Sequence, residues 1–203
     1  DKDKHSYMIG MTFGMQLKDF KDEVDVALIQ RAMADALAGE KTLMTEAEMQ
    51  EVSNAFRTVV QQKREAARVK AATENKTKGD EFLAKNKTAA GVKSTESGLQ
   101  YSVIKEGSGN KPKATDQVKV HYVGTLLNGT KFDSSIDRGQ PATFPLNGVI
   151  PGWTEGLQLM TVGSKYKFFI PGNLAYGEQG QPQGGIGPNE VLIFEVELLE
   201  ILN

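Results

Sequence analysis

The residues of this chain that could do chemistry gather in its second half, and most of them are aromatic or apolar. They fall largely in three short segments, VHYVGTL, KFDSS and VIPGWTEGLQLM. These segments contribute the following side chains, which two more aromatic residues join nearer the C-terminus: Tyr122, Phe132, Asp133, Val149, Ile150 and Trp153, then Tyr176 and Phe194. Side chains of these types predict an apolar pocket with aromatic walls that also includes one carboxylate.

The common sets of catalytic and metal-binding residues are missing from the sequence. The absence of cysteine excludes disulfides, thiol catalysis and zinc–thiolate sites. The two histidines, His5 and His121, lie far apart in the chain, so a histidine-based metal centre is not expected. No nucleophile elbow, HExxH motif or phosphate-binding GxxxxGK motif occurs. The sequence therefore predicts neither a metal nor a cofactor, and no hydrolytic, transfer or redox chemistry.

The glycine-rich segment 177–187, which we call the flap, does not fit a phosphate-binding loop because no helix is predicted to follow it. Its composition is equally compatible with a flexible cover over a pocket and with a plain surface loop.

Charge argues against nucleic acid as an obligate partner, and hydropathy argues against a membrane-spanning segment. A formal net charge of -2, from 26 acidic and 24 basic residues, argues against nucleic acid, whose backbone requires a basic surface. No apolar run is long enough to span a membrane, and no signal peptide is visible. The chain begins with DKDKHSY and without Met, as a processed or truncated product would, so we expect that an export signal could have been removed.

The first helix is predicted over residues 6–20 and is apolar on more than one face. Its two apolar stripes have helical spacing and consist of Met8, Met11 and Met15, and of Ile9, Phe13, Leu17 and Phe20. Such a short helix must be covered on more than one side. Packing on neighbouring helices of the same chain would satisfy this requirement. Adaptable methionine side chains favour the alternative, a segment for dimerisation.

Two further helices are predicted before the aromatic half of the chain. Asp25 is the expected N-cap of the second helix and Gly39 its end. Thr45 and Glu48 have the spacing of a capping box, and no proline interrupts the third helix before about residue 86. From residue 61 to 78 this helix is polar on all sides, which is typical of a connecting helix exposed to water, although a disordered charged linker is the alternative. Gly79 is expected to be a weak point.

Beyond a linker predicted at residues 87–98, the apolar pattern changes to the alternation of β-strands. Strands are expected near residues 99–103, 118–127, 130–133, 166–170 and 191–201, with a hairpin turn at Asn128-Gly129. Pro151 is expected to begin a short helix that extends to Met160. The predicted fold class is α+β: an antiparallel sheet wrapped on a short helix and preceded by an α-helical module and a long connecting helix.

The segments VHYVGTLLNGTKFDSS, VIPGWTEGLQLM, AYG and FEVELLEI, in this order, resemble the FKBP-type peptidyl-prolyl cis–trans isomerases over about residues 95–203. The N-terminal part is similar to the macrophage infectivity potentiator (Mip) group of bacterial FKBP-type proteins. In that group a methionine-containing dimerisation module and a long helix precede the isomerase domain. The resemblance therefore implies three parts here, with boundaries at 1–44, 45–87 and 88–203, and a homodimer formed through the N-terminal helices.

The same resemblance implies a role for each pocket residue. Trp153 would be the floor on which a substrate proline ring rests. The other substrate-binding residues would be Phe132, Val149, Ile150, Ile186 and Phe194, and the catalytic residues Tyr122, Asp133 and Tyr176. The backbone N–H of Ile150 and the hydroxyl of Tyr176 would bind substrate carbonyls. Without these motifs, a lone Trp or a Tyr on a strand would more often be a core residue, and Asp133 could be only a turn residue.

Three departures from the family pattern concern the pocket. Ala142 stands where single-domain members commonly have an aromatic residue, which should leave that wall open. The connection at residues 146–149 is short, and Gln181 replaces a histidine that is frequent in the flap. These changes should affect substrate preference and the affinity for macrolide inhibitors such as rapamycin.

The function expected from the sequence is peptidyl-prolyl isomerisation of folding polypeptides, together with chaperone activity. The alternative is a binding module, such as a chaperone or adhesion protein, whose isomerase activity is incidental. The Mip resemblance further implies an exported protein in the periplasm or at the outer membrane of a Gram-negative bacterium.

Overall fold

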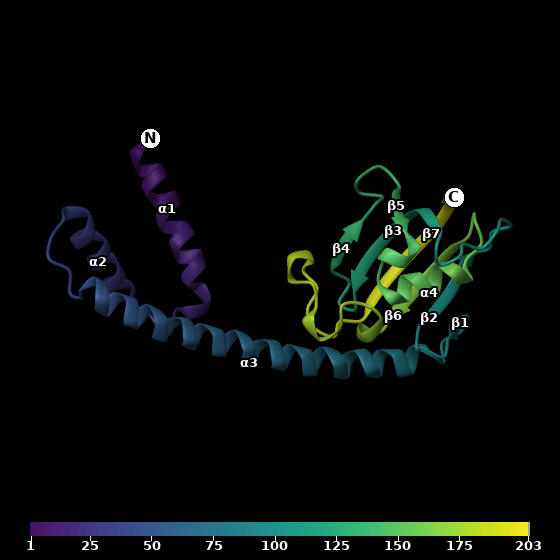
Figure 1. The fold of residues 1–203 in the computed structure, drawn as a ribbon, viewed down its shortest axis with the longest axis horizontal. Coiled ribbons are helices and arrows are strands. Elements are labelled where there is room, and N and C mark those ends of the chain that lie inside the picture. The colour runs from purple at the N-terminus through teal and green to yellow at the C-terminus, as the bar shows by residue number, and fades with distance from the viewer. Residues whose placement is uncertain (203) are drawn as a thin grey trace. The chain divides into compact units, whose positions relative to one another are not determined.

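The computed structural model describes residues 1–202 and, within them, every side chain except that of Asp19. The chain forms two compact units, an N-terminal unit Asp1–Ala66 and a C-terminal unit that begins at Ala67. The long helix α3, Glu46–Asn86, runs through both units (Figure 1). The three-part division implied by the resemblance remains a prediction. Within the described residues, no helix combines the length and apolar character needed to cross a membrane.

The N-terminal unit consists of α1 (Lys2–Leu17), α2 (Val26–Ala38) and the first part of α3. The predicted helix ends are confirmed. The Asp25 carboxylate accepts hydrogen bonds from the backbone N–H groups of Ala27 and Leu28, and Gly39 ends α2 in the left-handed conformation with φ of 69°. The Glu48 carboxylate accepts from the backbone N–H of Thr45 at 2.7 Å, while the Thr45 hydroxyl accepts from the N–H of Glu48 at 3.3 Å. This capping box lowers the pKa of Glu48.

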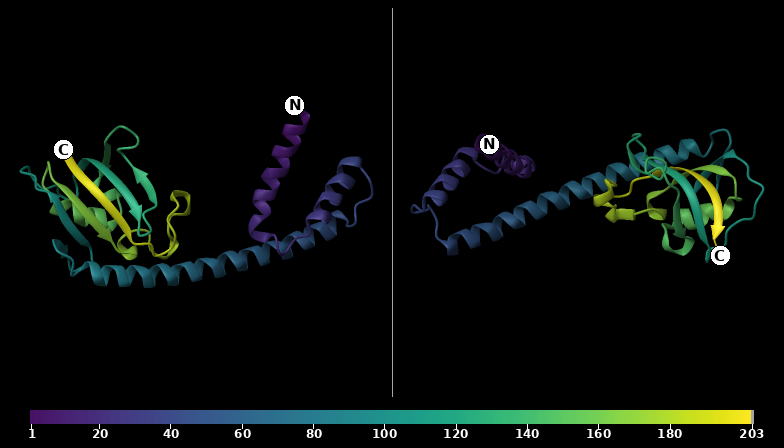
Figure 2. Two further views of the ribbon diagram at one scale, coloured as in Figure 1. Left: turned by 180° about the vertical axis from the view of Figure 1, so that it is seen from behind. Right: turned by 90° about the horizontal axis from the view of Figure 1, so that it is seen from above.

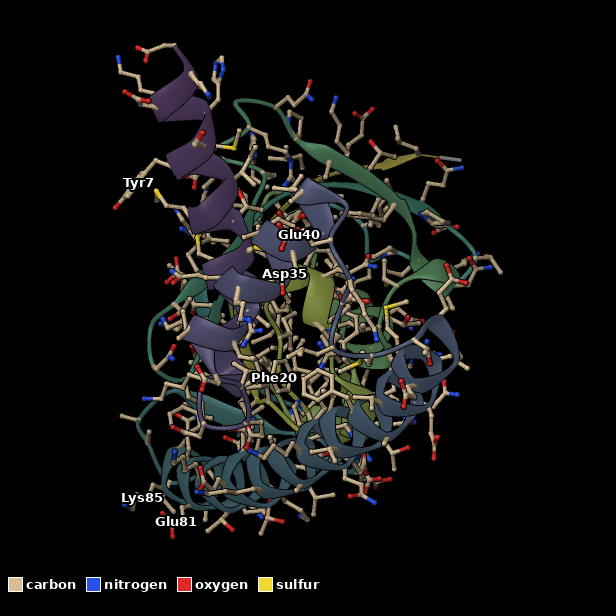
Figure 3. All side chains as sticks on the ribbon, turned by 90° about the vertical axis from the view of Figure 1, so that its left-hand side faces the viewer. Tyr7, Phe20, Asp35, Glu40, Glu81 and Lys85 are labelled. Carbon is tan, nitrogen blue, oxygen red and sulfur yellow. The ribbon has the colours of Figure 1, made fainter. Side chains whose placement is uncertain are left out.

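The apolar stripes of α1 are largely exposed in the single chain. Tyr7 has 74% of its surface exposed and projects from the helix into solvent (Figure 3), and Met15 is 65% exposed. The 3-10 helix Lys18–Phe20, which follows α1, contacts α3, where the rings of Phe20 and Phe56 lie 5.9 Å apart. Lys63 and Glu23 form an ion pair there. Helix packing inside the chain therefore leaves most of the α1 apolar surface uncovered.

The C-terminal unit is built around one antiparallel sheet. Its strands are β1 (Val92–Ser94), β2 (Gln100–Lys105), β3 (Gln117–Leu126), β4 (Lys131–Ser134), β5 (Ala142–Pro145), β6 (Lys165–Ile170) and β7 (Leu192–Leu202). The spatial order is β1-β2-β6-β7-β3-β4, and β5 pairs with β3. Helix α4 (Pro151–Leu159) lies against one face of the sheet, as Figure 2 shows. Short 3-10 helices occur at Lys18–Phe20, Leu146–Gly148, Gly172–Leu174, Gly177–Gln179 and Pro182–Gly184.

The core of this unit lies between the sheet and α4. Along β3 and β7 the side chains alternate between buried and partly exposed, as a strand with one covered face requires. Gly156 allows α4 to approach closely, because a Cβ at this position would lie 2.7 Å from the ring of Phe168. The predicted α+β class, the hairpin at Gly129 and the short helix at Pro151 are thus confirmed.

Two local predictions are wrong. The segment expected to be a plain linker, residues 87–98, contains β1, which pairs with β2. Gly79 is not a weak point but the one position of α3 with less than a tenth of its surface exposed. A Cβ at Gly79 would lie 2.7 Å from Cγ2 of Val191, so the absence of a side chain allows α3 to contact the rest of its unit. Propensity alone could not reveal this tertiary contact.

Candidate active site

A pocket of about 550 Å³ opens between α4, the sheet and the flap. All nine residues predicted from the sequence line it: Tyr122, Phe132, Asp133, Val149, Ile150, Trp153, Tyr176, Ile186 and Phe194. The structure adds Phe144, Gly148, Gln181 and Gly184. The lining comes from strands β3, β4, β5 and β7, from helix α4 and from two loops, so only the tertiary fold brings these residues together.

The floor of the pocket is held by aromatic packing. Trp153 belongs to the first turn of α4 and is 4% exposed. Its ring meets the rings of Tyr122, Phe144 and Phe194 edge to face, with centroids 5.1, 5.6 and 5.2 Å away. Perpendicular aromatic pairs of this kind are stabilising beyond their buried area. The indole is therefore fixed in orientation and presents a rigid apolar surface.

A polar cluster stands at one side of this apolar pocket. The hydroxyl of Tyr122 donates to Oδ2 of Asp133 at 2.5 Å. Arg138 forms an ion pair with the other carboxylate oxygen and donates from Nη2 to the Tyr122 hydroxyl at 2.8 Å. Its guanidinium also lies 5.6 Å from the centre of the Tyr122 ring. The carboxylate is thus held in place by two side chains from different parts of the chain.

The cluster determines which protonation states the pocket offers. Burial alone would raise the pKa of Asp133, but the hydrogen bonds from Tyr122 and Arg138 outweigh it and hold the pKa below its ordinary value. Burial, with the nearby Asp133 charge, raises the pKa of the Tyr122 and Tyr176 hydroxyls. Near neutral pH the pocket therefore presents one carboxylate and two protonated phenols, and none of the three is prepared to exchange a proton.

Besides the buried indole Nε1–H of Trp153, two further donors that line the pocket have no partner within residues 1–202. One is the backbone N–H of Ile150, the residue that precedes α4. The other is the hydroxyl of Tyr176, a residue that is 37% exposed. Donors that line a pocket without an internal acceptor are suited to bind the carbonyl oxygens of a ligand.

Sequence reasoning missed two side chains that matter here. Arg138 was overlooked, although a basic residue five positions after Asp133 in the turn SSIDRG was a possible signal. Phe144 lies outside the motifs of the family pattern, which place the wall aromatic at the position of Ala142. Ala142 and Phe144 lie two residues apart on β5 and therefore face the same side of the sheet, and the Phe144 ring lines the pocket. Gln181, which the sequence indicated only as a departure from the family pattern in the flap, also lines the pocket.

Known proteins are similar to this chain in both fold and sequence. A family model described as FKBP-type peptidyl-prolyl cis-trans isomerase matches residues 108–199. A second model, the domain amino-terminal to FKBP-type peptidyl-prolyl isomerase, matches residues 2–103. The crystal structure of FkpA from Escherichia coli superimposes with a TM-score of 0.77 at 38% identity, covering 99% of this chain and 96% of that one. The sheet wrapped on α4 therefore has the FKBP-like α+β fold.

Sequence relatives extend over nearly the whole chain. It is 52% identical to the FKBP-type peptidyl-prolyl cis-trans isomerase FkpA of Aeromonas hydrophila, over 98% of this chain and 76% of the relative. It is 45% identical to the outer membrane protein MIP of Legionella longbeachae, over 99% of this chain and 86% of that protein. The chain belongs to the family of FKBP-type peptidyl-prolyl cis–trans isomerases and is an enzyme of the isomerase class.

Proposed function

We propose that the pocket binds an Xaa–Pro segment of a polypeptide and lowers the barrier to rotation by holding the twisted amide without a covalent bond. The observation that carries this proposal is the meeting of a rigid aromatic floor with two open donors, Ile150 N–H and Tyr176 Oη, in one pocket. Trp153 takes the proline ring, and the walls formed by Phe132, Val149, Ile186 and Phe194 enclose it.

The physical reason lies in the amide itself. Resonance across the C–N bond produces a rotation barrier of about 18–20 kcal/mol, and this resonance is lost as the bond twists. The planar amide is more charge-separated than the twisted one, so an apolar pocket is less favourable to the planar ground state. A pocket shaped for the twisted form binds it more tightly and so accelerates rotation. No nucleophile or proton transfer is needed.

The polar groups of the pocket have complementary roles in this proposal. Ile150 N–H and the Tyr176 hydroxyl hold substrate carbonyls on either side of the bond that rotates. Asp133, ionised and held by Tyr122 and Arg138, places a negative charge beside the amide. Because the pKa of Asp133 is depressed, this charge is present throughout the neutral range.

The test compares variants of the full chain on a short Phe-Pro peptide. Asp133→Leu should lower kcat/KM about 100-fold, since a charged hydrogen-bonding group is removed, and Tyr176→Phe about 10-fold. Asp137→Asn and Tyr101→Phe are the matched controls, because they remove a nearby charge and a phenol hydroxyl outside the pocket. Loss of activity in the controls alone, or full activity in both pocket variants, would contradict the proposal.

Rapamycin offers a second test of where the substrate binds. Trp153 is the single tryptophan of the chain and forms the pocket floor, so its fluorescence reports ligand binding directly. We expect the drug to change this fluorescence and to block isomerisation at the same concentrations. Catalysis that persists while the drug is bound would place the substrate elsewhere.

We further propose that the N-terminal helices pair with those of a second copy and that the dimer holds unfolded chain. The exposed apolar side chains of α1 and α2 favour this second activity, because surface of this kind on a soluble chain marks an interface. Prevention of aggregation by Asp133→Leu, in the absence of isomerisation, would show that the two activities are separate. If that variant fails to protect an unfolded client, holding depends on the pocket.

The roles of the three parts of the chain and the location of the protein in the cell are also proposals. We assign dimerisation to residues 1–44, connection to residues 45–87 and isomerisation to residues 88–203. The relative from Legionella longbeachae is named an outer membrane protein, which favours export to the periplasm or outer membrane of a Gram-negative bacterium. Cell fractionation of the native host tests the location, and recovery only with cytoplasmic markers would refute it.

A further inference from the structure

The second half of α3 presents one continuous stripe of residues to the rest of the C-terminal unit. The stripe repeats at intervals of three or four and consists of Arg68, Ala72, Asn75, Gly79, Phe82 and Asn86, all partly or fully buried. Such intervals place residues on one face of a helix. Phe82 packs on Phe169 of β6, with 5.8 Å between the ring centres. Nδ2 of Asn86 donates a hydrogen bond to Oε1 of Gln100 in β2. This end of the stripe thus rests on the sheet.

The other end of the stripe contacts the flap. Nη1 of Arg68 donates to the carbonyl oxygen of Glu178 at 3.0 Å, and Nδ2 of Asn75 donates to that of Pro188 at 2.9 Å. Nδ2 of Asn189 donates in the opposite direction, to the carbonyl oxygen of Ala72 at 3.3 Å. One bond lies near the start of the flap and two lie just after its end. Figures 1 and 2 show the yellow-green flap reaching α3.

The flap is a closed loop whose shape depends on its ends. The backbone N–H of Asn189 donates to the carbonyl of Gly177 at 2.8 Å and closes the base. Gln181 and Ile186 exchange two backbone hydrogen bonds, of 2.8 and 3.1 Å, across its middle. Tyr176 stands directly before the base. A displacement of the base therefore moves Tyr176, Gln181 and Ile186 together, and all three line the pocket.

Asn189 has an unusual backbone. Within the described residues it is the one residue other than glycine with a positive φ, 54°. Asparagine tolerates this left-handed conformation better than most residues do. Asn189 lies where the chain turns from the flap into β7, and its side-chain amide donates the hydrogen bond to Ala72 of α3. Strain of this kind persists when the surrounding contacts determine it, and here the contact is with the helix.

From these contacts we propose that α3 positions the flap for catalysis, with Asn75 as a positioning residue that acts on the substrate through Tyr176. The inference rests on the proposed function of the pocket and extends it to a helix outside the pocket. The second half of α3 then supports the active site in addition to connecting the two units. Substrates that bind the Tyr176 hydroxyl depend on this support.

The sharpest variant is Asn75→Asp in the full chain. It preserves the size of the side chain but replaces the donor by an acceptor that faces the carbonyl of Pro188. We expect kcat/KM for a short Phe-Pro peptide to fall about 3- to 10-fold, the effect of one hydrogen bond, at a temperature well below Tm. Asn54→Asp makes the same chemical change on the exposed surface of α3 and should retain wild-type activity.

Asn189→Gly tests the same link from the other side. Glycine adopts the positive φ without strain, so this variant removes the side-chain donor to Ala72 without introducing a backbone clash. A fall in kcat/KM in the same direction is expected. A double-mutant cycle with Tyr176→Phe tests the route: if Asn75 acts through Tyr176, the Asn75→Asp loss should be smaller in the Tyr176→Phe background.

The possible outcomes separate this inference from the proposed function. Wild-type kcat/KM in both Asn75→Asp and Asn189→Gly overturns the inference, and so does an equal loss in Asn54→Asp. A lowered Tm with unchanged kcat/KM would assign the contacts to stability alone and would also overturn it. Losses that multiply independently in the cycle refute the route through Tyr176. An inactive wild-type chain would instead overturn the proposed function.

Discussion

The two units of this chain use their apolar side chains in opposite ways. In the C-terminal unit, Phe168 and Leu157 are almost completely buried between the sheet and α4. In the N-terminal unit, Tyr7 and Leu37 are among many large apolar side chains that remain exposed. One unit encloses its core and leaves the aromatic pocket open beside it, whereas the other leaves most of its large apolar side chains exposed.

This difference teaches how the two parts obtain their stability. A sheet and a helix that enclose more than a dozen large side chains form a complete core, so the geometry of the pocket depends on one chain alone. The three helices of the N-terminal unit together span only about 60 residues, which is marginal for a free-standing core. The N-terminal unit therefore depends on something that covers it, and a second copy of the chain is the partner that we propose.

The largest expected effect is a difference in the free energy of unfolding between aromatic-to-alanine substitutions in the two units. Phe168→Ala should lower the free energy of unfolding by about 3–5 kcal/mol, because it leaves a cavity in a closed core. Phe13→Ala, in exposed α1, should leave the same transition unchanged. Denaturant unfolding followed by Trp153 fluorescence reports the C-terminal unit only. Equal shifts in the two variants would show that the units do not differ in the way described.

The next effect concerns the surface of α1. Met11→Lys should weaken the homodimer about 30-fold, or about 2 kcal/mol, because a charge would be placed in an apolar interface. Light scattering at micromolar concentrations should detect the shift to monomer, with kcat/KM on a short peptide unchanged. Gln16→Lys adds the same charge at a polar position of α1 and serves as the control. A wild-type chain that is already monomeric would contradict the dimer.

A smaller effect is expected where α3 meets the C-terminal unit. Gly79→Ala improves helix propensity, but its Cβ would lie 2.7 Å from Val191. We expect the clash to dominate and to lower stability by about 1–2 kcal/mol. Combining it with Val191→Ala should relieve the clash, so that the double variant loses less than the sum of the single losses. A more stable Gly79→Ala protein would show that α3 does not pack closely here.

The smallest expected effect is that of pH on the pocket. The pKa of folded Asp133 lies below 3.8, so its contribution to stability is fully present above that value and is lost as the pH falls through the folded pKa. The pKa values of Tyr122 and Tyr176 lie above 10.0. kcat/KM should therefore be constant between about pH 5 and 9. An inflection within this range that disappears in Asp133→Asn would disprove the assignment.

Much of the fold could be predicted because local chemistry and tertiary structure agree. Asp25, Gly39 and the Thr45–Glu48 pair end or begin helices through bonds to neighbouring backbone groups. The alternation in β3 and β7 likewise reflects one covered face. Strands β1 and β5 were harder to predict, because short edge strands depend on the partners with which they pair.

Most of the candidate site could also be predicted, in this case from the spacing of motifs. Eight of the nine predicted residues belong to motifs with characteristic spacing, the ninth is Ile186 of the flap, and all nine line one pocket. Arg138 and Phe144 were missed because their importance comes from what they contact, Asp133 in one case and Trp153 in the other. Neither contact joins residues that lie next to each other in the chain.

The sequence by itself determined the family, the helix ends, the longer strands and nine residues of the pocket, since these depend on residue type and spacing. Only the tertiary structure decided that Gly79 is a contact point and that α3 holds the ends of the flap. Helix propensity describes one helix in water and contains no information about Val191, Pro188 or Asn189. Their positions follow from how β7 and the flap return to α3, about 110 residues further along the chain.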